Sequence, residues 1–143
     1  PLLDSRTLAP NPRAAKRNDI VEGILASLQQ SAELFKFKSK GLLISSHRVE
    51  ELERKGFRVE ISRPFVDGTL DGGHNLLALG LHLLSAAMID EEGTPSAEWR
   101  RIKNWEHFDE AWKRFGEEVT ELASGGTFDI DLAVELLFPS AND

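Results

Sequence analysis

The sequence predicts an α/β (or α+β) fold, a single small domain in which helices flank a short sheet. Two observations indicate this class: long segments in which apolar residues recur every three or four positions, and short apolar or alternating segments typical of strands. The 143 residues suffice for one domain with a core, and 41% hydrophobic and 29% charged residues are ordinary for a globular protein. We expect an N-terminal arm over residues 1–17 and the single domain over residues 18–143.

Besides one short helix between two predicted strands, four segments are predicted to be helices. The first begins near Asn18 or Asp19, either of which can act as N-cap, and its buried face is formed by Ile20, Ile24, Leu25 and Leu28. The second is the apolar stretch 76–88, and the third covers residues 97–103 behind Ser96 as its cap. The last has the strongest amphipathic pattern, with apolar residues at Trp105, Phe108, Trp112, Phe115, Val119 and Leu122.

Strands are predicted between these helices. Residues 35–38 alternate phenylalanine with lysine, residues 41–45 form an apolar run, residues 57–61 alternate, and residues 128–138 form the last strand. Before the third strand, Ser46 is expected to cap a short helix that carries Val49 and Leu52 and ends at Gly56. Asp67 and Gly68 are expected to form a turn.

Composition excludes several classes of protein. The chain has no cysteine, so disulfides, zinc–thiolate sites and thiol catalysis are excluded, and a cytoplasmic protein is expected. No apolar run approaches the roughly 20 residues that a membrane-spanning helix needs. The net charge is +4 over residues 1–66 and −11 over residues 67–143. This asymmetry indicates either a nucleic-acid-binding basic half or simply two differently solvated surfaces, and we favour the second interpretation.

The most informative motif is the segment Asp71, Gly72, Gly73, His74 and Asn75, at the predicted junction of a strand and a helix. Two glycines there let the backbone turn tightly and let another molecule approach closely. The first turn of the following helix offers unpaired N–H groups and the positive end of the helix dipole, which together attract an anion. His74 and Asn75 are the side chains best placed to contact such a ligand.

Each residue of this region also has a simpler structural interpretation. Asp71 could be the helix N-cap, and Asp67 and Asp71 could share a magnesium ion, although aspartates in glycine turns are more often turn formers. His74 could be a general base or a phosphate donor, or it could tie the loop to a backbone carbonyl. His82 is expected to be a semi-buried helix residue, and His47 a surface residue.

Alternating lysines suggest a basic surface. Lys36, Lys38 and Lys40 alternate along one predicted strand and are expected to share one face, and Lys38 and Lys40 would supply charge to a phosphate. The alternative is a solvated strand edge that is protected against aggregation.

The chain resembles the AIPR family, named for abortive-infection phage resistance. The residues that carry the resemblance lie in 37–41, 50–52, 68–78, the helix that begins at Trp105, and 134–139. Members of that family are usually much longer. The resemblance implies either an N-terminal part of a phage-defence protein or a short relative of that family.

The loop is also similar to the Asp-Gly-x-His-Arg signature of the ParB/sulfiredoxin-like fold, in which a helix N-terminus binds nucleotide phosphate. Asp71, Gly72 and His74 match this signature, and Asn75 stands where it has arginine. Asparagine cannot form the bidentate contact with phosphate that arginine forms. This similarity implies a phosphate-facing loop and a ParB/sulfiredoxin-like sheet.

Three hypotheses for function follow. The first is a phage-defence module that binds a nucleotide or nucleic-acid backbone through Gly72, Gly73, His74, Asn75, Lys38 and Lys40. The second is a nucleotide or phosphodiester hydrolase, assisted by magnesium or histidine, with Asp71 and His74 as catalytic residues. The third is a non-catalytic protein-interaction domain whose loop is purely structural.

Overall fold

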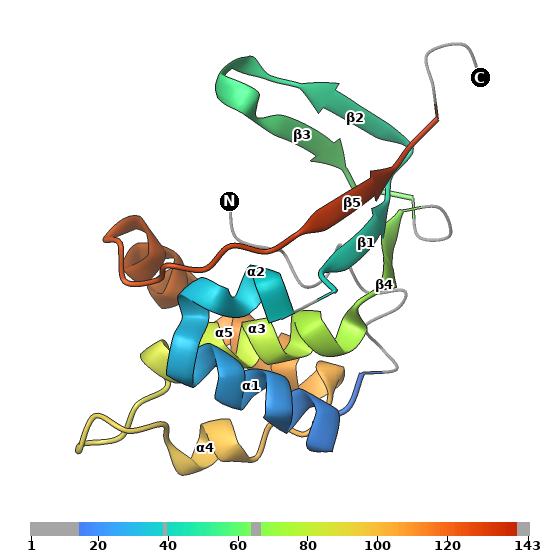
Figure 1. Cartoon of the computed structure of the whole chain (residues 1–143). Coiled ribbons are helices and arrows are strands. Elements are labelled where there is room, and N and C mark those ends of the chain that lie inside the picture. The colour runs from blue at the N-terminus through green and yellow to red at the C-terminus, as the bar shows by residue number, and fades with distance from the viewer. Residues whose placement is uncertain (1–14, 39, 64–66, 140–143) are drawn as a thin grey trace.

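The computed structural model describes residues 15–38, 40–63 and 67–139 (Figure 1). The fold is small, mixed α/β, with a three-stranded mixed sheet and a separate two-stranded hairpin, both open. Figure 1 shows the helices gathered on one side of the three-stranded sheet and the hairpin extending away from them. The predicted α/β class is therefore confirmed at this level.

Helix α1 (Asp19–Ser31) begins where the sequence predicts. The side chain of its N-cap, Asn18, accepts a 3.1 Å hydrogen bond from the N–H of Val21. Val21, Leu25 and Leu28 form the buried face. Ile20 is exposed, so its predicted burial is wrong: the buried stripe follows the spacing 21, 25 and 28, and position 20 lies one helical step to the side of it.

Helix α3 (Gly73–Ala87) is the centre of the core and contacts both α1 and α5 (Trp105–Ser124). The α5 N-cap, Asn104, accepts a 2.9 Å hydrogen bond from the N–H of His107. A Cβ atom on Gly80 would lie 2.4 Å from the ring of Phe108, so this glycine permits the close approach of α3 and α5. The predicted amphipathic helix over α5 is confirmed, with Trp105, Phe108 and Val119 buried.

The sheet has the strand order β4-β1-β5, where β4 is Gly68–Asp71, β1 is Leu42–Ser45 and β5 is Val134–Leu137. Strands β1 and β4 are antiparallel with a register shift between Leu43 and Ile44. Strands β1 and β5 are parallel in a regular register. Leu42 and Ile44 of β1 are buried in the core that the helices form.

The predicted last strand is shorter in the structure. Only Val134–Leu137 pairs with β1, whereas residues 128–133 form no regular element. Phe128, Ile130 and Leu132 nevertheless pack against the core. In residues 128–133 every second residue is thus partly buried, although the segment pairs with no strand.

The hairpin pairs β2 (Arg48–Glu51) with β3 (Phe57–Glu60), and its tip is a short 3-10 turn, η3 (Glu53–Lys55). The helix predicted after Ser46 is wrong, because residues 48–51 pair with β3 and place Val49 opposite Val59. Cross-strand pairing decides the conformation of such a short segment, whatever its local capping signals. Gly56 ends the 3-10 turn.

The strand predicted over residues 35–38 is also wrong. These residues form the helical turn α2 (Phe35–Lys38), which continues from η2 (Ala32–Leu34) and thus from the end of α1. Phe35 is buried. Lys36, Lys38 and Lys40 therefore do not alternate along one strand.

Two shorter features complete the fold. Helix α4 (Ala97–Arg100) begins behind Ser96, whose hydroxyl accepts a 3.2 Å hydrogen bond from the N–H of Trp99, so the predicted cap is confirmed. Of the predicted arm, residues 1–14 lie outside the described residues. Ala15 is buried, and the N–H of Arg17 donates to the carbonyl of Lys103 at 2.7 Å. No helix in the described ranges combines the length and apolarity needed to cross a membrane.

Candidate functional site

The predicted loop lies at the junction of β4 and α3. Asp71 is the last residue of β4, and Gly72 occupies the N-cap position of α3, so the prediction of Asp71 as N-cap is wrong. Gly72 has a φ of +92°, and a Cβ atom on it would lie 2.4 Å from the carbonyl oxygen of Gly41. Packing of the junction against the residues that lead into β1 therefore requires this glycine. The side chains of Asp71 and Lys38 lie outside what the structure describes.

Asn75 fastens the same junction. Its Nδ2 donates a 2.9 Å hydrogen bond to the carbonyl oxygen of Gly41. The amide that replaces the arginine of the ParB-like signature therefore has an internal partner, which fixes the first turn of α3 to the start of β1.

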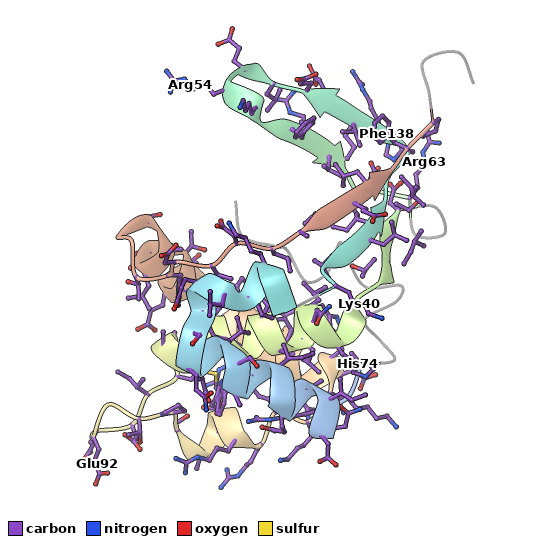
Figure 2. The ribbon with its side chains drawn as sticks, in the orientation of Figure 1. Lys40, Arg54, Arg63, His74, Glu92 and Phe138 are labelled. Atoms are coloured by element: carbon purple, nitrogen blue, oxygen red, sulfur yellow. The ribbon has the colours of Figure 1, made fainter. Side chains whose placement is uncertain are left out.

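His74 faces the start of α1. Its Nε2 lies 3.5 Å from Nδ2 of Asn18, the residue whose side chain caps α1. Because an amide nitrogen can only donate, this contact is a hydrogen bond in the tautomer whose Nε2 carries no proton. Figure 2 shows His74 and Lys40 at the same end of α3, and Lys40 is exposed.

The start of α5 lies close to the same place. Lys16 forms an isolated bridge with Asn104, the N-cap of α5, and Asn18 follows two residues later. The first turns of α1, α3 and α5 are therefore connected through the short segment 16–18. The first turn of each helix carries the positive end of the helix dipole. Three acidic residues in the first turns of α1 and α5 oppose this positive potential: Asp19, Glu22 and Glu106. Of these, Glu22 is paired with Arg17 at 2.5 Å.

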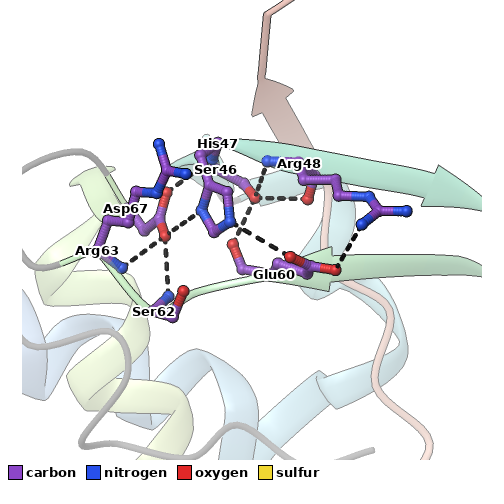
Figure 3. A network of polar contacts seen from close by, with 7 residues as sticks. All are labelled: Ser46, His47, Arg48, Glu60, Ser62, Arg63 and Asp67. Atoms are coloured by element: carbon purple, nitrogen blue, oxygen red, sulfur yellow. Dashed lines mark hydrogen bonds and ion pairs between the residues drawn. The ribbon is translucent and has the colours of Figure 1, made fainter.

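A second polar cluster joins the two ends of the hairpin. We call it the hairpin-base cluster, and its members are Ser46, His47, Arg48, Glu60, Ser62, Arg63 and Asp67 (Figure 3). Asp67 is central, with a side chain only 1% exposed. Its Oδ1 accepts from the N–H of His47 at 2.7 Å, and its Oδ2 accepts from the N–H groups of Ser62 and Arg63, each at 2.8 Å.

These hydrogen bonds stabilise the ionised carboxylate. Burial acts to raise the pKa of Asp67, but the N–H groups of Arg63 and Ser62, the ring of His47 and the N–H of His47 together lower this pKa to about 2. A carboxylate that accepts several N–H hydrogen bonds is favoured in its charged form. Asp67 thus remains an anion that connects β1 and β2, through His47, to the segment between β3 and β4.

His47 lies between two carboxylates. Its Nδ1 is 2.6 Å from Oδ2 of Asp67, and its Nε2 is 3.2 Å from Oε2 of Glu60. The side chain is only 14% exposed, so the prediction of a surface histidine is wrong. Since both ring nitrogens have partners, the ring connects Asp67 to β3 and has no free nitrogen with which to act as a general base in this arrangement.

Ser46 extends the cluster to the backbone of the hairpin. Its buried hydroxyl oxygen lies 2.6 Å from the carbonyl oxygen of Glu60 and 2.7 Å from that of Arg48, and it accepts from the N–H of Arg48 at 3.2 Å. The hydroxyl thus bonds to the first residue of β2 and the last residue of β3. The cluster as a whole fixes the start and end of the hairpin to the three-stranded sheet.

Asp67, one of the two aspartates expected to bind magnesium, is occupied by hydrogen bonds within the protein. Both oxygens of Asp67 already accept hydrogen bonds, so this residue serves the hairpin and does not form a simple turn with Gly68, which begins β4. Across residues 15–38, 40–63 and 67–139, no three histidine, aspartate or glutamate side chains come together in a way that could hold a metal ion.

His82 does not join His74. Its ring contacts Phe128 edge to face, with centroids 6.4 Å apart, and its Nδ1 is buried with no hydrogen-bond partner among the described residues. Burial lowers the pKa of His82. The prediction of a semi-buried helix residue agrees with this position.

Sequence reasoning found the β4–α3 junction but missed the hairpin-base cluster. Glycines and a histidine next to an apolar run form a local signal, whereas His47 and Asp67 are 20 residues apart and meet only when the hairpin closes. The polar pair Ser46 and His47 directly after a buried strand is the sole local hint.

Comparisons with protein families, curated proteins and solved structures gave no match to this chain.

Proposed function

We propose that this chain binds a phosphate-bearing ligand, a nucleotide or a nucleic-acid backbone, at the N-terminal end of α3. The contacts would come from the N–H groups of Gly73 and His74, from the His74 ring and from the Lys40 ammonium group. The observation that carries the proposal is the N-cap of α3, which is a glycine and has no side chain to accept from the first N–H groups.

The other helices provide a direct comparison. In α1, α4 and α5 an N-cap side chain accepts from the first turn: Asn18, Ser96 and Asn104, respectively. Helix α3 has fifteen residues, and its N-cap, Gly72, offers no side chain that could accept from the first turn. An anion supplied from outside would satisfy these donors and interact favourably with the helix dipole.

Binding has more support than hydrolysis. His74 and Lys40 both lie at this end of α3 (Figure 2), whereas Asp67 and Asn75 are engaged in contacts that hold the fold together. The hydrolase that would use Asp71 and His74 as catalytic residues stays a prediction. So does the role in phage defence implied by the resemblance to the AIPR family.

The test is a thermal-shift titration with ATP, ADP and inorganic phosphate, each with and without magnesium. A ligand at 100 times its dissociation constant stabilises the folded state by about 2.7 kcal/mol, which raises the melting temperature by several degrees. We expect this shift in the parent chain and a clearly smaller one in His74→Ala and Lys40→Ala. Lys55→Ala is the matched control, because it removes the same charge at the hairpin tip.

Two results would contradict the proposal. One is the absence of a shift with any of these phosphates. The other is a shift that Lys55→Ala reduces as much as Lys40→Ala does, because that result would indicate non-specific attraction by surface cations.

A further inference from the structure

Strand β5 is an edge strand of the sheet in the part of the chain that the structure describes. It pairs with β1 on one side only, in the strand order β4-β1-β5. The N–H groups of Leu42 and Ser46 donate to the carbonyls of Ala133 and Leu137. Because backbone groups alternate along a strand, those of Val134 and Leu136 point away from β1. They form a row of donors and acceptors on the outer side of the sheet.

The side chains at this edge are apolar and exposed. Val134, Leu137 and Phe138 are 46%, 51% and 52% exposed, and Phe138 lies near the base of the hairpin (Figure 2). Leu136 is half-buried and packs against the core. A fourth strand beside β5 would extend the core past Leu136 on the face that Val134 shares, and it would cover Leu137 on the opposite face. Grouped exposed apolar side chains of this kind mark interaction surfaces.

The opposite edge of the sheet is less suited to pairing. The β4 side has a register shift against β1, and Gly68 and Gly72 at its two ends have φ values of +132° and +92°. Irregular edges resist the addition of a strand. Strand β5, in contrast, pairs with β1 residue for residue from Val134 to Leu137.

The side chains around β5 are acidic, which favours a partner strand with basic side chains. Residues 126–139 contain three exposed acidic residues and no basic residue: Asp129, Asp131 and Glu135. Lys36 pairs with Asp131 at 3.5 Å, and no basic side chain of the described residues is seen to pair with Glu135. A second copy of this chain would place acidic residues opposite acidic residues, which destabilises cross-strand pairs.

We propose that β5 accepts an extended segment of another protein in which apolar residues alternate with lysine or arginine. The main-chain hydrogen bonds supply affinity, as in other cases of strand addition. A cationic residue opposite Glu135 supplies selectivity, and its apolar neighbours lie on the face of Leu136. This surface is separate from the end of α3 and does not depend on phosphate binding.

The probes are two synthetic heptapeptides, one alternating valine with lysine and one alternating valine with glutamate. Binding to the 15N-labelled full chain is followed by amide chemical shifts. We expect the lysine peptide to shift the amides of β5 and to bind more tightly than the glutamate peptide. Glu135→Lys should weaken the lysine peptide by up to about fivefold and reverse the preference.

A backbone variant separates pairing from simple charge attraction. Val134→Pro removes an N–H that points away from β1, so the β1–β5 hydrogen bonds are kept while the outer row loses a donor. We expect this variant to fold, as judged by its melting curve, and to show no binding of the lysine peptide. The matched control Asp109→Lys changes charge on α5 and should leave binding at β5 unchanged.

Three outcomes would overturn the proposal. The first is that neither peptide shifts the amides of β5. The second is that the lysine peptide binds Val134→Pro as tightly as the parent chain. The third is that sedimentation shows a dimer that Val134→Pro dissociates, because the occupant of the edge would then be a second copy of this chain.

Discussion

Replacing the carboxylate of Asp67 is expected to release the base of the hairpin. Oδ2 accepts from three donors and Oδ1 from one. In Asp67→Asn, the amide oxygen can replace only one of the two carboxylate oxygens. The NH₂ group takes the place of the other oxygen and then faces at least one N–H donor. A hydrogen bond to a charged group contributes about 1.5–3 kcal/mol, so we expect a loss of about 3 kcal/mol.

The loss should be local, because the helices do not depend on the hairpin-base cluster. Amide exchange of β2 and β3 reports the opening of the hairpin, and a loss of about 3 kcal/mol corresponds to exchange that is faster by about a hundredfold. Asp129→Asn is the matched control, since it removes the same charge from an exposed position. Equal exchange rates in the two variants would refute the assignment of Asp67 as the residue that holds the hairpin.

The pH dependence follows from the same carboxylate. The pKa of Asp67 is lowered from 3.8 to about 2 in the folded state, so the unfolded chain binds the proton more tightly. The stabilisation by Asp67 is therefore complete above about pH 4 and is lost as the pH falls toward 2. The stability difference between the parent chain and Asp67→Asn should shrink over this range in urea titrations. A difference that stays constant would contradict the assigned ionisation.

Three further predictions concern the helices, and each is measured by guanidinium unfolding followed by tryptophan fluorescence. Gly80→Ala places a methyl group 2.4 Å from the ring of Phe108 and should lower the free energy of unfolding by about 1–3 kcal/mol. Gly23→Ala, which meets no atom within 4 Å, should instead stabilise α1 by up to about 1 kcal/mol. Equal effects of the two substitutions would contradict the packing argument. Gly72→Ala combines a positive φ with a 2.4 Å backbone contact and should cost at least about 2 kcal/mol, and an unchanged midpoint would contradict the tight junction. Asn104→Ala removes the α5 cap and should cost about 1 kcal/mol, with Asn104→Ser largely restoring it.

The long helices could be predicted because their signals are local. The steps of three and four residues along α5 and the cap residues Asn18 and Ser96 act within one or two turns, and the structure has helices at these places. The same is true of the β4–α3 junction, where glycine and an apolar run are neighbours in the chain. Propensity and pattern are sufficient when the interactions that decide an element lie within it.

The short segments could not be predicted in this way. Residues 35–38 alternate like a strand but have no partner strand and continue the preceding helical turns, and residues 48–51 follow a cap-like serine but pair with β3. For a segment of four residues, the local preference is weaker than the contribution of a few hydrogen bonds to a distant strand. Pairing with β3 therefore decided the conformation of residues 48–51, and continuation of the preceding helical turns decided that of residues 35–38.

The α/β class, the long helices and the position of the glycine junction follow from local sequence patterns, since periodicity and capping are properties of neighbouring residues. Folding of the whole chain is needed before Gly72 and Asn75 fasten the junction to Gly41, and before His47, Glu60 and Asp67 join the ends of the hairpin. It also left β5 at the edge of the sheet. The physical reason is common to all three: each depends on groups far apart in the chain, whose proximity is fixed only when the strands pair and the helices pack.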